Sequence, residues 1–192
     1  MPSLYFFAPN VRAIQRREPH MNLKKLTVSA LMLALCMVLP FLTGQIPQIG
    51  SMLLPMHLPV LLCGFLCGWP YGLAVGFIAP LLRFAMFGMP PIFPTGMAMA
   101  FELAAYGAFT GVFYQLLPKK TGMLFVSLIL AMAAGRVVWG IAECFLLGLG
   151  GFTWAAFVSG AFLNAIPGII LQIVLIPAIL IALRKGNLML DE

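Results

Sequence analysis

Long, uninterrupted runs of apolar residues are the feature that most constrains the fold of this 192-residue chain. Hydrophobic residues make up 62% of it and charged residues only 8%, against roughly 25% charged residues in typical soluble domains. Inside lipid every backbone polar group needs a partner within the protein, so only helices or closed barrels can span a membrane. The runs are long and do not alternate apolar with polar residues, which indicates helices. The sequence therefore predicts an all-α integral membrane protein.

Glycine and proline clusters divide the apolar runs into six predicted spanning helices. They cover residues 26–43, 52–68, 71–88, 96–117, 123–147 and 155–183. We expect residues 21–192 to form one compact six-helix membrane domain. Residues 1–20 are polar and basic, and we expect them to be a disordered or dispensable extension, with Met21 as an alternative start of translation.

The basic residues outside these helices predict the orientation, because cytoplasmic loops retain Lys and Arg. The connections "GQIPQIG", "GMPPIFPT" and "GLGG" carry no charge. With both termini in the cytoplasm, all the basic clusters lie inside. These residues are Arg12, Arg16, Arg17, Lys24, Lys25, Lys119, Lys120, Arg184 and Lys185.

Charged residues also occur inside the apolar runs, where each costs about 2.5–3.5 kcal/mol near the membrane centre on insertion scales. Counted along the helices, the polar residues of five helices fall mainly in the outer third of the membrane. This shared level favours a polar cavity that opens to the outside. The candidate substrate-binding residues are His57, Arg83, Glu102, Arg136, Glu143 and Asn164. The inner halves are almost free of polar residues, with Gln172 as the main exception.

An alternative explanation is that these charges are structural. Arg83 could pair with Glu102, and Arg136 with Glu143, so that two ion pairs hold the bundle together. His57, between Pro55 and Pro59, could equally bond a neighbouring carbonyl or a ligand. The sequence leaves these alternatives open.

Small residues spaced four apart predict close helix packing in lipid. Gly64 and Gly68, Gly72 and Gly76, and Gly107 and Gly111 have this spacing in the second, third and fourth predicted helices. Ala30 and Ala34 in the first helix share it and could pack internally or dock another membrane helix. The four cysteines all lie in predicted helices without the converging ligands of a zinc site, so no metal is expected.

Three stretches carry a family resemblance: "LTVSALMLAL", "LPMHLPVLLCGFLCGWPYGLAVGFIAPLL" and "MPPIFPTGMAMAFELAAYG". Residues 21–185 resemble the substrate-binding S component of energy-coupling factor (ECF) vitamin transporters. The Pro-x-His-x-Pro and Phe-Glu-Leu-Ala-x-Tyr-Gly stretches look most like the pantothenate-type branch. The resemblance implies a multi-pass protein of a prokaryotic cell membrane that captures a vitamin from outside, with pantothenate as the best candidate and pyridoxine as an alternative.

The resemblance also implies partners. A transmembrane coupling subunit and two ATPase subunits would drive uptake, and Ala30 and Ala34 would dock the coupling subunit. The chain has no Walker A motif of its own. We expect no cofactor, no nucleic-acid partner and no enzymatic activity.

The main alternative from another class is an intramembrane enzyme using His57, Glu102 and Glu143. However, no His-Glu-x-x-His or Gly-x-Ser-x-Gly signature is present. A structural protein would not need the polar layer, and a self-contained secondary transporter usually has internal repeats that are absent here.

Overall fold

The computed structural model describes residues 23–43, 46–148 and 153–190, and every regular element in these ranges is helical. The expected extension at residues 1–20 lies outside the described residues. The elements are α2 (Leu23–Leu42), α3 (Pro47–Leu53), α4 (His57–Cys67), α5 (Trp69–Phe87), η1 (Ile92–Gly96), α6 (Met97–Leu116), α7 (Thr121–Leu147), α8 (Trp154–Val158), η2 (Ser159–Leu163) and α9 (Ile166–Lys185).

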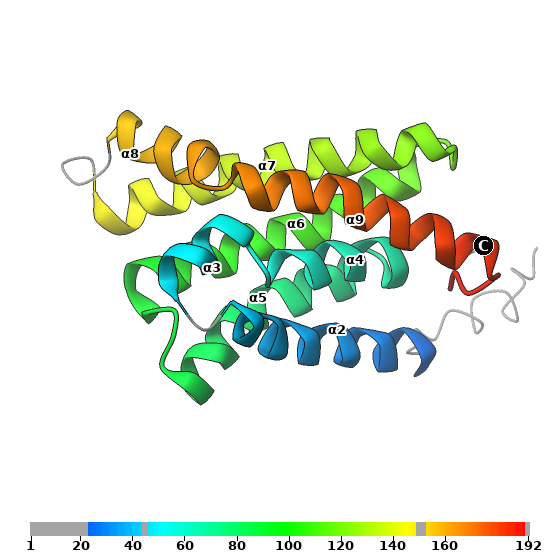
Figure 1. Cartoon of the computed structure of the whole chain (residues 1–192), viewed down its shortest axis with the longest axis horizontal. Coiled ribbons are helices and arrows are strands. Elements are labelled where there is room, and N and C mark those ends of the chain that lie inside the picture. The colour runs from blue at the N-terminus through cyan, green and yellow to red at the C-terminus, as the bar shows by residue number, and fades with distance from the viewer. Residues whose placement is uncertain (1–22, 44–45, 149–152, 191–192) are drawn as a thin grey trace, which may run out of the picture.

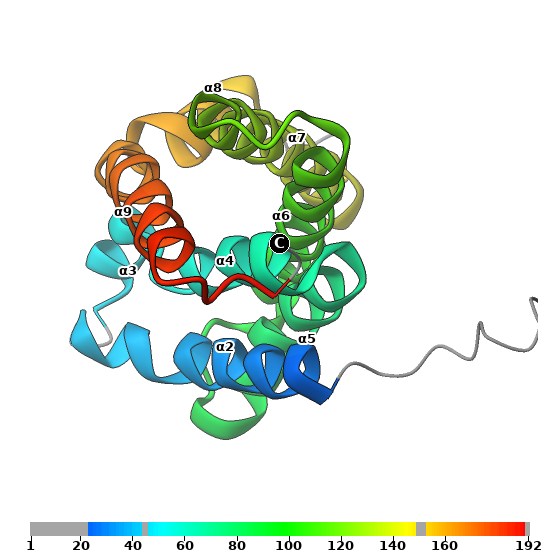
Figure 2. The ribbon, with the colours of Figure 1, turned by 90° about the vertical axis from the view of Figure 1, so that its right-hand side faces the viewer.

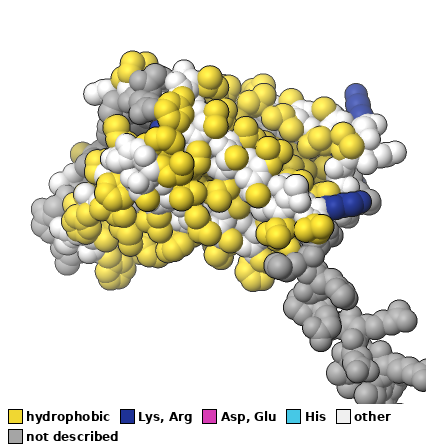
Figure 3. All heavy atoms as spheres, turned by 90° about the horizontal axis from the view of Figure 1, so that it is seen from below, with side chains coloured by type: hydrophobic (Ala, Val, Ile, Leu, Met, Phe, Trp, Pro, Cys, Tyr) yellow, Lys and Arg dark blue, Asp and Glu magenta, His cyan; other side chains and the backbone are white. Residues whose placement is uncertain are grey.

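Five helical stretches in the described part of the chain are long and apolar enough to cross a membrane. They are α2, α5, η1 with α6, α7 and α9. The predicted helical membrane class is therefore confirmed. The elements lie side by side along the long axis of the molecule, and their apolar side chains cover the face on which α2 lies (Figures 1 and 3).

The second predicted helix, 52–68, is divided in two. Leu54 adopts a left-handed conformation with a φ of 50°, and Pro55 has no N–H to continue the helical bonds of α3. The helix therefore restarts at His57, and α4 has 11 residues. At about 1.5 Å per residue it is about 16 Å long, half the ~30 Å of a hydrocarbon core. Almost all of α4 is buried, enclosed by its neighbours in the bundle (Figure 2).

The sixth predicted helix, 155–183, is also interrupted. After α8 and η2 the chain turns at Asn164 and Ala165, and α9 begins at Ile166. Pro167 stands in the first turn of α9, where its fixed φ and missing N–H are tolerated. The break displaces Asn164 from the helix on which the sequence analysis placed it.

The core packs around backbone contacts between glycines. A Cβ on Gly107 of α6 would strike the backbone of Gly72 on α5, and one on Gly64 of α4 would strike the backbone of Gly107. A Cβ on Gly76 would meet the backbone of Leu103. The prediction of close packing at these spacings is confirmed. Gly68 is different, because with a φ of 93° it ends α4 and starts the turn into α5.

The start of α2, the α6–α7 connection and the C-terminus lie at the same end of the molecule (Figure 1). This end holds the described basic clusters Lys24 and Lys25, Lys119 and Lys120, and Arg184 and Lys185. The opposite end holds α3, the connection from α5 to α6 with η1, and α8 (Figure 1).

Candidate functional site

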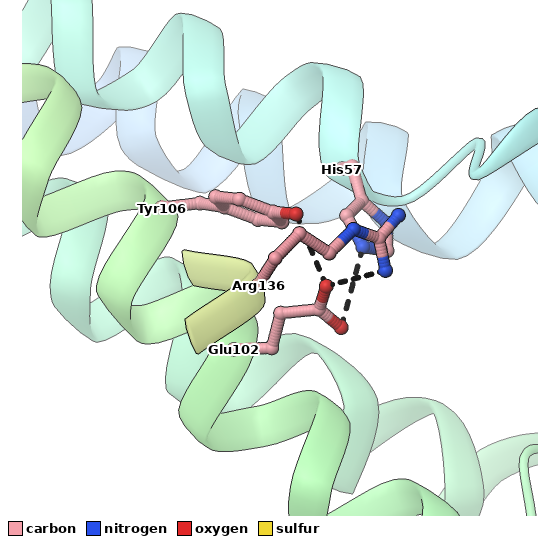
Figure 4. A network of polar contacts seen from close by, with 4 residues as sticks. All are labelled: His57, Glu102, Tyr106 and Arg136. Atoms are coloured by element: carbon pink, nitrogen blue, oxygen red, sulfur yellow. Dashed lines mark hydrogen bonds and ion pairs between the residues drawn. The ribbon is translucent and has the colours of Figure 1, made fainter. Parts of the chain in front are cut away.

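The side chains of His57, Tyr106 and Arg136 meet around Glu102 in the interior of the bundle (Figure 4). Arg136 Nη1 lies 2.8 Å from Glu102 Oε1, and the Tyr106 hydroxyl donates a hydrogen bond of 3.1 Å to the same oxygen. His57 Nε2 lies 3.6 Å from Glu102 Oε2. Glu102 is only 3% exposed. Its negative charge is therefore balanced by the Arg136 guanidinium within the protein.

Local sequence features bring these groups together. Tyr106 follows Glu102 by four residues, so both lie on the same face of α6. The break at Leu54 places His57 at the first turn of α4, with its ring 5.3 Å from the Tyr106 ring. A Cβ on Gly135 would strike the Tyr106 ring. Glycine at that position therefore allows α7 to bring Arg136 against α6.

Arg83 on α5 has a different environment. It is 4% exposed, and its Nη1 donates a hydrogen bond of 2.7 Å to the Met37 carbonyl. Its guanidinium carbon lies 5.3 Å from the ring centroids of both Phe41 and Phe87. No described carboxylate lies within ion-pair distance of it. Arg83 is thus a buried positive charge held by aromatic rings and one carbonyl.

Neither of the two ion pairs considered from the sequence, Arg83 with Glu102 and Arg136 with Glu143, forms in the structure. Glu102 pairs with Arg136 rather than with Arg83. Glu143 is half-buried on α7, two turns beyond Arg136, and makes no ion pair with a described residue. Position along a helix gives the depth of a residue, but the partner depends on which way each helix faces.

A cavity of about 560 Å³ lies at the end of the bundle opposite the basic clusters. Its volume falls in the range of small-molecule sites, about 300–1,000 Å³. Arg83, Glu102 and Arg136 supply its charged groups. The other lining residues, mostly apolar, are Pro40, Thr43, Ile46, Gln48, Gly50, Leu54, Pro55, Met56, Met89, Pro90, Pro91, Thr95, Met99, Trp139 and Gly160.

The structure brings four of the six candidate residues to this site. Arg83, Glu102 and Arg136 line the cavity, and His57 is buried against Glu102. Glu143 does not line it, and Asn164 is exposed in the turn before α9, where its backbone N–H bonds the Ser159 carbonyl. Glu143 and Asn164 therefore do not line the cavity, and their place in the polar layer stays a prediction.

Sequence reasoning missed Tyr106 and Trp139. Tyr106 could have been found from its spacing of four residues from Glu102 on one helix. Trp139 follows Arg136 by three residues and lines the same cavity. Residues three apart on a helix also share a face, so the same spacing argument could have found Trp139.

Ala30 and Ala34 lie on the exposed side of α2, beside exposed Leu31 and Val38. The opposite side of α2 is buried against the bundle. The alternative that these alanines pack internally is therefore wrong. In the part of the chain that is described, no group of three or more His, Cys, Asp or Glu side chains is arranged to hold a metal.

Comparison with known families gives one match. The family model described as ECF transporter, substrate-specific component, matches residues 24–180. No curated protein and no solved structure matches the chain.

Proposed function

The chain belongs to the family of ECF transporter substrate-specific components, and from this premise we propose that it binds pantothenate for uptake into the cell. Members of this family are substrate-binding subunits of membrane transporters rather than enzymes, and they act with ECF transmembrane and ATPase components.

The observation that carries the proposal is the unbalanced charge of Arg83. Of the two buried arginines that line the cavity, Arg136 is paired with Glu102, whereas Arg83 has no carboxylate partner among the described residues. A guanidinium has five N–H donors in a planar fork that matches a carboxylate. A ligand with one carboxylate would therefore balance the charge of Arg83, and pantothenate carries one.

The remaining groups of the site suit the rest of such a ligand. Glu102 accepts hydrogen bonds and Arg136 donates them, at the cavity wall. The apolar lining, including Met56, Met99 and Trp139, suits aliphatic carbons. A neutral vitamin such as pyridoxine would leave the Arg83 charge unbalanced.

The proposed orientation places both termini in the cytoplasm of a prokaryotic cell and the cavity at the outer surface. The basic residues at one end of the bundle support it, since cytoplasmic ends retain Lys and Arg. In this arrangement α3 and α4 together provide the sixth crossing between α2 and α5. Ala30 and Ala34 on the exposed side of α2 would dock the transmembrane component, and two ATPase subunits would complete the transporter.

Ligand titration of the purified protein without partners tests the proposed substrate. We expect pantothenate to bind, and panthenol, in which an alcohol replaces the carboxylate, to bind much more weakly. Equal affinity for the two compounds, or preferential binding of pyridoxine, would show that the site does not recognise a carboxylate.

A further inference from the structure

Gln172 on α9 is a polar residue that the proposed site does not yet use. It is 1% exposed, and neither its amide nitrogen nor its amide oxygen has a hydrogen-bond partner among the described residues. It belongs to the buried side of α9, with Gly168 one turn before it and Ile176 one turn after. An amide buried without a partner carries a free-energy cost for the folded protein. An apolar residue would avoid this cost, so the amide indicates a polar ligand group nearby.

A second hollow lies between α7 and α9. It is lined by Ile129, Met132, Ala133, Arg136, Ile169 and Ile173. Ile169 and Ile173 stand on either side of Gln172 along α9, and Gln172 itself is not a lining residue. The hollow measures about 190 Å³, some six times the ~30 Å³ that a water molecule occupies in the liquid, which is room for a group of about six heavy atoms.

Arg136 connects this hollow with the main cavity, because it lines both. Its Nη1 is engaged by Glu102, but its Nη2 is buried without a partner among the described residues. The hollow therefore combines branched aliphatic walls with a guanidinium N–H group at the boundary of the outer cavity.

We infer that this hollow is an inner compartment of the ligand site and that it receives the end of the ligand opposite the carboxylate. The inference rests on the proposed function. The occupant is a branched aliphatic group with a hydroxyl: its carbons contact the isoleucines, and its hydroxyl bonds Arg136 Nη2 and the Gln172 amide. The pantoyl arm of pantothenate, with two methyl groups on one carbon and two hydroxyls, has this chemistry. Arg83 then binds the carboxylate, and the inner compartment binds the pantoyl arm.

Two substitutions test the inner compartment separately. Gln172→Met removes the amide with little change in shape. Ala133→Phe fills the hollow from its exposed side, and Val137→Phe is the matched control, because Val137 is an exposed residue one turn further along α7 that does not line the hollow. Affinities for pantothenate, panthenol and N-acetyl-β-alanine, which lacks the pantoyl arm, are measured by displacement of radiolabelled pantothenate. The melting temperature of each ligand-free variant is recorded as well.

We expect Gln172→Met to weaken pantothenate and panthenol binding alike, by about five- to tenfold for one lost hydrogen bond, and to leave N-acetyl-β-alanine binding unchanged. The ligand-free melting temperature should rise, because the substitution removes an unpartnered buried amide. Ala133→Phe should likewise weaken binding of pantothenate and panthenol but not of N-acetyl-β-alanine. Val137→Phe should change none of the three affinities.

Three results would overturn the inference while leaving the proposed function intact. The first is an unchanged affinity of Gln172→Met for pantothenate. The second is an equal effect of Ala133→Phe and Val137→Phe on pantothenate affinity, as expected if lipid chains fill the hollow. The third is an equal loss of affinity for all three ligands in Gln172→Met or Ala133→Phe. If the wild-type protein does not bind pantothenate at all, the proposed function fails and the inference fails with it.

Discussion

Replacement of Arg83 by glutamine should lower the affinity for pantothenate by about two orders of magnitude. The guanidinium is 4% exposed and lines the cavity, and opposite unit charges about 4 Å apart attract by about 4 kcal/mol at an effective dielectric constant of about 20. Loss of one partner of a buried charge pair typically costs about 2–5 kcal/mol. Because the cavity opens to water, we take about 3 kcal/mol, which corresponds to roughly 100-fold in affinity.

The assay is calorimetric titration of the purified protein with pantothenate and with panthenol. Arg83→Gln should reduce pantothenate binding and leave panthenol binding unchanged, since panthenol has no carboxylate to lose. Arg184→Gln is the matched control: this arginine also lies over an aromatic ring, that of Tyr114, but it is near the C-terminal end of α9, away from the cavity. Equal loss of both ligands in Arg83→Gln, or no loss of pantothenate in a folded variant, would refute the carboxylate role.

Three further experiments test docking, the buried cluster and orientation. Ala34→Trp on the exposed side of α2 should impair assembly with the transmembrane component, measured by co-purification, and leave ligand affinity intact. Loss of both assembly and ligand affinity would mean that Ala34 supports the ligand site rather than docking. Glu102→Gln leaves Arg136 buried without its carboxylate and should destabilise the protein by about 3–5 kcal/mol in thermal or denaturant unfolding. Adding Arg136→Gln should recover part of the lost stability, and no recovery in the double variant would mean that the two residues are not coupled. In a cysteine-free background, Phe93→Cys should react with an impermeant thiol reagent added outside cells and Lys120→Cys should not, and the reverse pattern would invert the proposed orientation.

The helical membrane class could be predicted from the sequence, because it depends on a local property, the long apolar runs. Apolar runs define the helices, and counting residues from their ends gives depth. Arg83 and Glu102, which the residue count placed at one level, line one cavity, and Arg136, counted as two turns deeper than Glu143, lines it as well. The spacing of Gly107, Gly72 and Gly64 likewise predicted close contacts that the structure contains.

The helix breaks and the ion-pair partners could not be predicted in the same way. The left-handed conformation of Leu54 is unfavourable for a leucine by itself, so it depends on packing with residues distant in the sequence. The pairing of Arg136 with Glu102 depends on the rotation of α7 against α6, which the contact of Gly135 with Tyr106 permits. The positions of the charged residues along their helices are compatible with several different ion pairs.

The central claim, that this family member binds a carboxylate-bearing vitamin, is tested most directly by identifying what the protein retains. The protein is purified without partner subunits from cells grown in a medium that contains several vitamins, and the small molecules released on denaturation are measured by mass spectrometry. The wild-type protein should release pantothenate in near-stoichiometric amount, and the Arg83→Gln variant should release little. Retention of a neutral vitamin such as pyridoxine, equally by wild type and variant, would contradict the account.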